Sequence, residues 1–442
     1  MEMRGLANFI HDIRKATSNR EEEQRRIEVE LAKIRSRFKE AASMSTYDRK
    51  KYVVKLMFIA MLGYTVDFGH MEGVQLLANQ GAPEKLIGYL SLTVFLNENH
   101  ELLTLTTHMV HLDLISSKEF NVCLALTAIA NIGGRDFAET MHQAVKKLLV
   151  TPGTAVQLRK KALLTYLRLY RKYKEVADVT DIAPMAVESI THPNMGLSNC
   201  AMTFLLGVCH QEDPSLFANV VPQCIALMSS IIVEKRTEPE YIYYGVPAPW
   251  VQAKALRLLQ QFPAPPADSP LRNKMNNVLS KLIKATEKVL RDTQTQQKQR
   301  GTANRSNAMN AALFEAVSLI IQWDCDAALL KDCSELLSTF INDKKDANFR
   351  YLGLLLLGRL SFSTNTTFNF AESCRPFQQQ IVVALHDIDI SIRKRALDVT
   401  YNICGAHNSN EIIGELLAYL PTAEPSFKED LVLIICILAE KF

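Results

Sequence analysis

The feature that most constrains this chain is a loose repeat of helical segments. From Val66 onward, apolar residues recur at helical spacing between breaks rich in Gly, Pro, Asn and Asp, and no alternating run is long enough for a sheet. A small residue followed by Leu or Met recurs at Ala125-Leu126, Ala162-Leu163, Ala201-Met202, Ala255-Leu256, Ala312-Leu313, Gly353-Leu354 and Ala396-Leu397. The steps are 37, 39, 54, 57, 41 and 43 residues, and four of them lie near the ~40-residue period of HEAT and armadillo helical pairs. The sequence therefore predicts an all-α fold, a HEAT/armadillo-like right-handed α-solenoid, over residues 1–442 as one domain.

Insertions explain the two longer steps of the repeat. They fall at Arg236–Pro249, which is rich in Pro and Tyr, at Pro263–Pro270, and at the polar segment Thr293–Ser306. We expect the first insertion to pack over a helix junction, with a binding loop as the alternative. Residues 293–306 are predicted to form a flexible loop.

Charge is distributed unevenly, although hydrophobic residues at 48% and charged residues at 22% are typical of a globular protein. Residues 1–61 carry fourteen Lys and Arg against nine Asp and Glu, a net of +5 within a total of +3. An anionic partner is therefore expected at the N-terminal end. The nine cysteines form no CxxC pair, which indicates a reduced, cytosolic protein with buried thiols.

No signal peptide is evident, and no apolar run reaches the ~20 residues that a membrane-spanning helix needs. We therefore expect a soluble protein whose membrane contact is peripheral. The apolar run Leu431–Ala439 lies close to Phe442, and it predicts that further chain or a partner covers that helix.

Two N-terminal helices precede the repeats. The first is predicted over Arg4–Ala16, and the second, highly charged, over Arg20–Ala41. Their apolar stripes are Leu6, Phe9, Ile10 and Ile13 in the first, and Ile27, Leu31, Ile34 and Phe38 in the second. Residues 1–62 are thus expected to form basic helices that face a membrane and a partner.

The third helix starts with cations and continues into the core. Arg49, Lys50, Lys51 and Lys55 precede or interrupt the apolar run that ends at Tyr64. A helix N-terminus adds backbone N–H groups and a partial positive charge, so this stretch suits a multiply charged anion. The alternative is a solvated basic helix start.

No other pattern carries a strong indication of chemistry. His108, His111 and Asp113 lack the spacing of the HExxH metal motif, and a metal site there is the less favoured interpretation. Gly353 and Gly358 have a GxxxxG spacing without the Lys-Ser/Thr of a nucleotide loop, and they indicate close packing of helices. No nucleophile motif or nucleotide loop is present, so we predict no enzyme, no metal and no cofactor. Nucleic acid is disfavoured because the cations are compactly clustered, which suits a phosphoinositide headgroup better.

Several blocks resemble the alpha-adaptins, the family of large subunits of the plasma-membrane clathrin adaptor complex. The blocks are Met3–Arg14, Lys50–Leu56, Asp67–Glu72, Ile87–Leu90, Val246–Trp250 and Ser306–Ala316. The resemblance covers the whole chain. It implies an α-solenoid trunk that assembles with a small sigma, a medium mu and a beta subunit, and a location in the cytoplasm at the inner face of the plasma membrane, in clathrin-coated pits.

The resemblance also implies functional residues. Binding of phosphatidylinositol 4,5-bisphosphate would fall on Arg4, Tyr47, Arg49, Lys50, Lys51, Tyr52 and Lys55. Arg49 stands where a Lys is usual, which keeps the charge. Arg14 would help the sigma subunit to bind acidic dileucine signals of cargo, and clathrin would be reached indirectly. The family's chain continues into a hinge and an ear domain that are absent here.

Two alternatives remain open from the sequence. A gamma-type adaptin of the Golgi and endosomal complex is similar around Ile87–Leu90, but it lacks the basic triplet and the Pro-Ala-Pro-Trp block. A HEAT-repeat nuclear transport receptor shares the solenoid, and it would be expected to have a longer array.

Overall fold

The computed structural model is almost entirely helical, and it describes residues 3–16, 19–40, 44–295, 302–343 and 346–442. The chain divides into two compact units. The first comprises residues 1–189 and 203–216, and the second comprises residues 190–202 and 217–442. The prediction of one continuous solenoid domain therefore stays a prediction.

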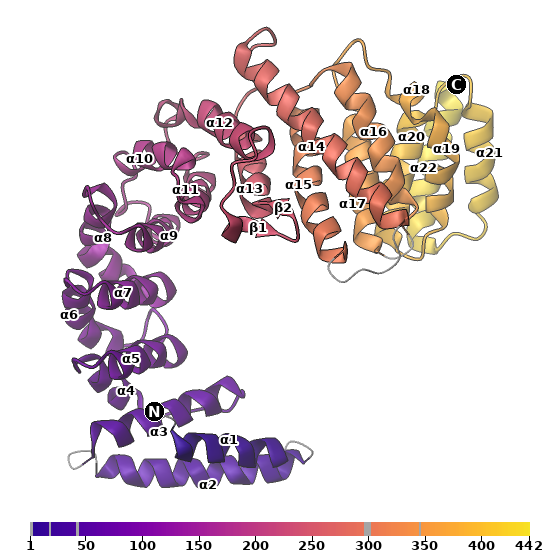
Figure 1. Cartoon of the computed structure of the whole chain (residues 1–442). Coiled ribbons are helices and arrows are strands. Elements are labelled where there is room, and N and C mark those ends of the chain that lie inside the picture. The colour runs from indigo at the N-terminus through magenta and orange to yellow at the C-terminus, as the bar shows by residue number, and fades with distance from the viewer. Residues whose placement is uncertain (1–2, 17–18, 41–43, 296–301, 344–345) are drawn as a thin grey trace. The chain divides into compact units, whose positions relative to one another are not determined.

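The first unit is a stack of helices in two layers (Figure 1). Its helices are α1 (Arg4–Ala16), α2 (Arg20–Lys39), α3 (Thr46–Met61), α4 (His70–Leu77), α5 (Ala82–Phe95), α6 (Leu102–Leu114), α7 (Glu119–Ile132), α8 (Arg135–Val150), α9 (Val156–Lys172) and α10 (Ile182–Glu188). Helices α3, α5, α7 and α9 pack on one another in sequence, and α4, α6 and α8 pack on them from the other side. This alternation is the pairing expected of a solenoid.

The second unit repeats the same arrangement. Its helices are α12 (Val220–Ile232), α13 (Pro249–Leu259), α14 (Pro270–Thr295), α15 (Thr302–Gln322), α16 (Ala327–Ile341), α17 (Ala347–Leu360), α18 (Phe370–Cys374), α19 (Gln378–Val383), α20 (Ile390–Ile403), α21 (Ser409–Tyr419) and α22 (Pro425–Lys441). Helices α13, α15, α17, α20 and α22 form one layer, in which each helix packs on the next. Helix α11 (Met195–Val208) contributes residues to both units.

The small-residue pairs of the sequence mark one helix of each repeat. They fall on α7, α9, α11, α13, α15, α17 and α20, and all fourteen residues are buried. A small side chain lets the partner helix approach closely, and a Cβ placed on Gly353 of α17 would lie 3.1 Å from Cβ of Phe340 on α16. The predicted all-α solenoid is confirmed, and the pairs are its packing surface.

The three N-terminal helices pack together, and α3 joins them to the stack of the first unit. Helix α1 lies along α2, and both contact α3 (Figure 1). The predicted stripes meet there, because Phe9 and Ile13 of α1 pack with Ile27 of α2 and Ile59 of α3. The ring of Phe9 meets that of Phe58 edge-on, with centroids 6.1 Å apart. Phe9 and Ile13 of the α1 stripe are therefore covered by the chain itself, whereas Leu6 and Ile10 are only partly buried.

The insertion at residues 236–249 contains a minimal hairpin, strands β1 (Ile242–Tyr243) and β2 (Val246–Pro247). Its buried Val246 packs with Val289 of α14 and Met309 of α15. The insertion therefore packs over a helix junction, as predicted. Helices α14 and α15 extend into the predicted 293–306 loop from both sides, to Thr295 and from Thr302, while residues 296–301 lie outside the described residues.

One stretch bears on the expectation that no apolar run is long enough to span a membrane. The stretch Pro214–Ile232 is long and apolar enough to cross a bilayer by length and composition. In the structure this stretch is not one helix. A 3₁₀ turn at Pro214–Phe217 is followed by α12, which has only 13 residues. Helix α12 packs on α13 and α14 with its apolar face buried, which makes it a core helix of the second unit.

Candidate anion-binding site

Helix α3 begins earlier than the basic triplet. Ser45 is its N-cap, and the hydroxyl oxygen of Ser45 accepts a hydrogen bond from the backbone N–H of Asp48 at 3.1 Å. Asp48 is the charged residue of the first turn, so Arg49, Lys50 and Lys51 follow in the second turn. The expected cationic first turn is therefore wrong, and Asp48 complements the positive end of the helix dipole.

The start of α1 lies against the start of α3. A Cβ placed on Gly5 would lie 3.6 Å from Cδ of Lys51, which brings the neighbouring Arg4 to this surface. Arg4 is exposed, and so is Tyr47. The ammonium of Lys51 lies over two rings, 5.7 Å from the centroid of Tyr47 and 4.6 Å from that of Tyr52. Lys51 thus lies beside both the start of α1 and the ring of Tyr47, and a shared headgroup site with Arg4 stays a prediction.

Lys50 and Lys51 are each held by a carboxylate. Lys50 forms an ion pair with Glu84, which comes from the first turn of α5, and the two side chains are 13% and 20% exposed. Lys51 donates to a carboxylate oxygen of Asp48 at 2.6 Å. These hydrogen bonds lower the pKa of the Glu84 carboxyl and the pKa of the Asp48 carboxyl, so both groups are ionised at neutral pH.

Tyr52 and Lys55 are buried, in contrast with the other residues of the predicted site. The ammonium of Lys55 donates to Glu30 of α2 and lies 5.4 Å from the ring centroid of Phe9. Arg26 donates to the other oxygen of Glu30 at 3.1 Å. Burial alone raises the pKa of the Glu30 carboxyl, but the hydrogen bonds from Lys55 and Arg26 outweigh it, and that pKa is lowered.

Arg14 lies at the other end of α1. It is exposed in the last turn of this 13-residue helix, and Arg4 is in the first turn. At ~1.5 Å per residue, the two positions are about 15 Å apart along the axis. The structure therefore separates the two predicted roles, a headgroup site at the start of α1 and a cargo-signal residue at its end.

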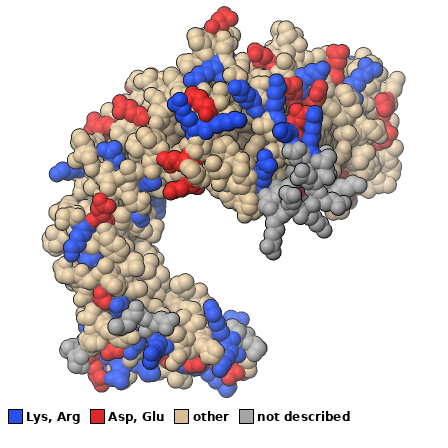
Figure 2. Space-filling model, viewed as in Figure 1, with Lys and Arg blue, Asp and Glu red and all other residues tan. Residues whose placement is uncertain are grey.

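The charges of this region are mixed. Figure 2 shows Lys and Arg interspersed with Asp and Glu over the three N-terminal helices. Asp12 pairs with Arg26 at 3.2 Å, and Asp67 pairs with Arg35 at 2.9 Å. The carboxylates that oppose the lysines were missed by sequence reasoning. The pairing of Asp48 with Lys51 could have been predicted, because the two residues are three apart on one helix. Glu30 and Glu84 are 25 and 34 residues from their partners.

The histidine constellation on α6 does not form a cation site. Both oxygens of Asp113 accept hydrogen bonds from the ammonium of Lys85 at 2.7 Å, and one also accepts from the hydroxyl of Tyr89 at 2.8 Å. The carboxylate therefore faces α5 rather than His108 and His111. Within the described residues, no cluster of three or more His, Cys, Asp or Glu is placed to hold a metal ion.

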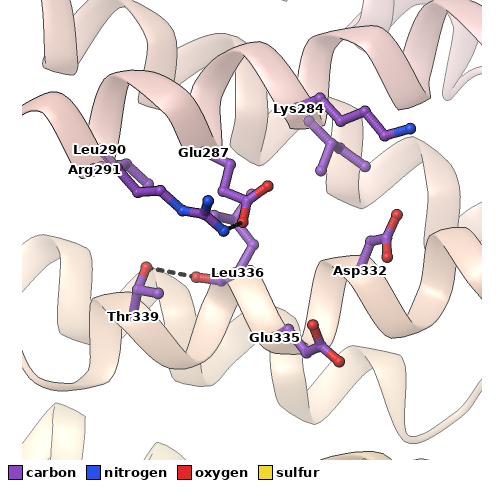
Figure 3. A pocket seen from close by; sticks show the side chains of 9 residues that line it. Lys284, Glu287, Leu290, Arg291, Asp332, Glu335, Leu336 and Thr339 are labelled. Carbon is purple, nitrogen blue, oxygen red and sulfur yellow. Dashed lines mark hydrogen bonds and ion pairs between the residues drawn. The ribbon is translucent and has the colours of Figure 1, made fainter.

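An open groove with charged residues of both signs lies between α14 and α16 (Figure 3). It has a volume of about 370 Å³. Arg291 is paired with Glu287 on the same helix, and the hydroxyl of Thr339 donates to the carbonyl of Leu336 at 2.7 Å. Asp332 and Glu335 belong to α16 and point to the same groove as Lys284. Nucleophile, base and oxyanion donor are not assembled among these lining residues.

Comparison with known proteins identifies the family. Residues 23–442 match the family model described as the adaptin N terminal region. Over 440 residues the chain is 39% identical to the AP-2 complex subunit alpha-1 of Arabidopsis thaliana, covering 100% of this chain and 42% of that protein. It is also 39% identical over 440 residues to the AP-2 complex subunit alpha-2 of Dictyostelium discoideum, covering 43% of that protein. The AP-1 complex subunit gamma of Dictyostelium discoideum is 31% identical over 424 residues, which cover 95% of this chain and 44% of that protein.

These matches confirm the resemblance to alpha subunits and disfavour the gamma-type alternative. The chain spans less than half the length of the relatives. Among structures, it is similar to a homology model of the full-length AP-3 complex in an intermediate open conformation, with a TM-score of 0.52 and 18% identity over 89% of this chain and 64% of that one. An engineered protein matches with a TM-score of 0.54 and 14% identity, over 93% of this chain and 99% of that one. At such identities the likeness shows the fold alone, an α-solenoid.

Proposed function

This chain belongs to the adaptin family, because residues 23–442 match the adaptin N terminal region, and we propose that it is the trunk of a large, alpha-type subunit of the plasma-membrane clathrin adaptor complex. In this role it is a non-enzymatic scaffold that assembles with sigma, mu and beta subunits. The identity to alpha subunits, 39% against 31% for a gamma subunit, supports the alpha type. Its working place is the cytoplasmic face of the plasma membrane.

The membrane contact of this proposal is the surface shared by α1 and α3. Arg4, Tyr47, Arg49, Lys50 and Lys51 bind the headgroup of phosphatidylinositol 4,5-bisphosphate, and Tyr52 and Lys55 support them from below. The single observation that supports this site is the approach of the start of α1, at Gly5, to the side chain of Lys51 on α3. At roughly 1 kcal/mol per cation, four surface cations give about 4 kcal/mol, a dissociation constant near 1 mM. Such a site binds a membrane weakly by itself, and a multivalent assembly strengthens that binding.

The cargo contact of the proposal is Arg14. With the small sigma subunit it binds the acidic part of a dileucine signal, since a guanidinium pairs well with carboxylates. The exposed position of Arg14 at the end of α1 supports this role.

Charge reversal tests the headgroup site. The double variant Lys50→Glu, Lys51→Glu should lose binding to vesicles of phosphatidylcholine that contain phosphatidylinositol 4,5-bisphosphate, because two attractive charges become repulsive. The helical circular dichroism should stay unchanged. The matched control is Lys147→Glu, Arg168→Glu, which reverses two exposed cations on α8 and α9. Equal vesicle binding by wild type and the Lys50, Lys51 variant would contradict the proposal.

A further inference from the structure

The two lysines of the surface site are paired with carboxylates of a particular kind. Asp48 lies in the first turn of α3, and Glu84 lies in the first turn of α5. A carboxylate at that position interacts favourably with the partial positive charge of the helix N-terminus, whether or not a lysine is present.

Each carboxylate also has a second partner. The hydroxyl of Ser45 donates to Asp48 at 2.8 Å. Glu84 folds back over the start of α5, where a Cβ on Gly81 would collide with its carboxylate, and it accepts a hydrogen bond from its own backbone N–H. When the lysine turns away, each carboxylate therefore keeps a hydrogen bond and the helix dipole.

The buried pair of Lys55 and Glu30 differs in this respect. Glu30 lies in the middle of the 20-residue helix α2, and its side chain and that of Lys55 are only 3% and 6% exposed. Separating these two charges would leave an ammonium without compensation inside the bundle, which is strongly unfavourable. The Lys50–Glu84 pair is 13% and 20% exposed and the Lys51–Asp48 pair is 19% and 41% exposed, so both pairs reach solvent, and their lysines can change partner at a lower cost than Lys55.

From this difference we infer that Asp48 and Glu84 are built-in competitors for the anion site, a step that rests on the headgroup site proposed above. In the free chain Asp48 forms an ion pair with Lys51, and Glu84 forms one with Lys50. A bound anion takes over both lysines, and the two carboxylates remain at their helix N-termini. Asp48 and Glu84 are therefore specificity-determining residues, although they contact no phosphate.

The exchange favours headgroups with more than one phosphate. A phosphate monoester carries about −1.5 to −2 charges, enough to replace one carboxylate on one lysine. An inositol ring with two phosphates replaces both carboxylates, whereas a singly phosphorylated ring leaves one pair intact. Each exchange is favourable, so a bisphosphate gains more than a monophosphate, but it must also displace both carboxylates. The two carboxylates therefore weaken binding of every anion and weaken it most for a bisphosphate.

The test measures binding of the chain to phosphatidylcholine vesicles that contain either phosphatidylinositol 4-phosphate or phosphatidylinositol 4,5-bisphosphate. Glu84→Gln and Asp48→Asn should each bind bisphosphate vesicles about three- to tenfold more tightly than wild type, because one competing ion pair is gone. The double variant should show a larger preference for the bisphosphate, because the bisphosphate is relieved of two competing carboxylates and the monophosphate of only one. Soluble inositol 1,4,5-trisphosphate should displace the chain from the vesicles if the headgroup alone is the ligand.

Two controls separate this inference from a general effect of charge. Glu119→Gln removes an exposed carboxylate from the first turn of α7, and it should leave binding unchanged. In a Lys50→Gln background, Glu84→Gln should give no gain. Thermal unfolding checks that each variant is folded.

The outcomes distinguish the inference from the function on which it rests. Wild-type binding with no gain in Glu84→Gln and Asp48→Asn overturns the competitor role and leaves the headgroup site standing. A wild type that binds no phosphoinositide vesicle, with variants equally inactive, overturns both.

Discussion

At the scale of single residues, the site combines lysines with two different tasks. Lys50 and Lys51 are partly exposed and pair with first-turn carboxylates, whereas Lys55 is buried beside Phe9 and pairs with Glu30. All three are cations in one short stretch of sequence. The more exposed Lys50 and Lys51 are suited to binding an anion, whereas the buried Lys55 contributes to the stability of the bundle.

The buried pair gives a stability prediction. Lys55→Met should destabilise the chain by about 3 kcal/mol at neutral pH, because Glu30 then remains buried with only Arg26 as partner. Urea unfolding measures this loss. Lys39→Met, at an exposed position near the end of α2, is the matched control and should change little.

The same prediction has a pH dependence. The pKa of Glu30 is lower in the folded chain than its usual value, so its contribution to stability is complete above about pH 4.3 and is lost as the pH falls through the folded pKa. The difference between wild type and Lys55→Met should therefore shrink below that pH. A difference that stays constant, or grows, in acid would contradict this account of Glu30.

At the scale of elements, glycines and alanines set how closely paired helices approach. A Cβ on Gly88 of α5 would lie 2.9 Å from the backbone nitrogen of Leu77 and 3.1 Å from the backbone carbon of Leu76. These are backbone atoms of the α4 segment, which cannot rotate away. The close contact of α4 with α5 therefore depends on the absence of a side chain at Gly88.

This contact can be tested with one methyl group. Gly88→Ala should destabilise the chain by about 1–3 kcal/mol, because α4 and α5 must move apart. Gly414→Ala is the control, since Gly414 also lies within a helix and a Cβ there would meet nothing within 4 Å. It should be neutral or stabilising by up to ~1 kcal/mol. Equal effects of the two variants in thermal unfolding would show that helix propensity, and not packing, decides at Gly88.

At the scale of the whole molecule, the first unit exposes apolar side chains that a partner subunit would cover. They lie on α5, α6 and α7 and at the C-cap of α6: Leu90, Val94, Leu105, Leu112, Ile115 and Phe120. Exposed apolar surface of this kind favours association. The adaptin family membership makes a small sigma subunit the proposed partner.

Co-expression tests this partnership. The soluble yield of the chain should rise several-fold with a small sigma subunit, and the two should co-purify, because burial of apolar surface stabilises both. A small subunit of an unrelated complex serves as the control. Equal yields with both subunits, without co-purification, would argue against the assembly.

The sequence by itself determined the helices, their buried faces and the two-layer packing, because helical periodicity and small-residue pairs are local properties. It also placed Arg4 and the basic triplet in one region, through resemblance. The helix start at Thr46 was missed, because the cap residue Ser45 precedes the cations and was not used as a boundary.

Only the tertiary structure decided which cations are available. Glu30 and Glu84 reach Lys55 and Lys50 from helices 25 and 34 residues away, and no local pattern specifies such a meeting. Burial is likewise a property of the packed bundle, since Lys51 and Lys55 are one turn apart on α3, yet Lys55 alone is enclosed by α1 and α2. The sequence determines the charge of a lysine, whereas its ability to bind an anion depends on the carboxylate that folding places beside it.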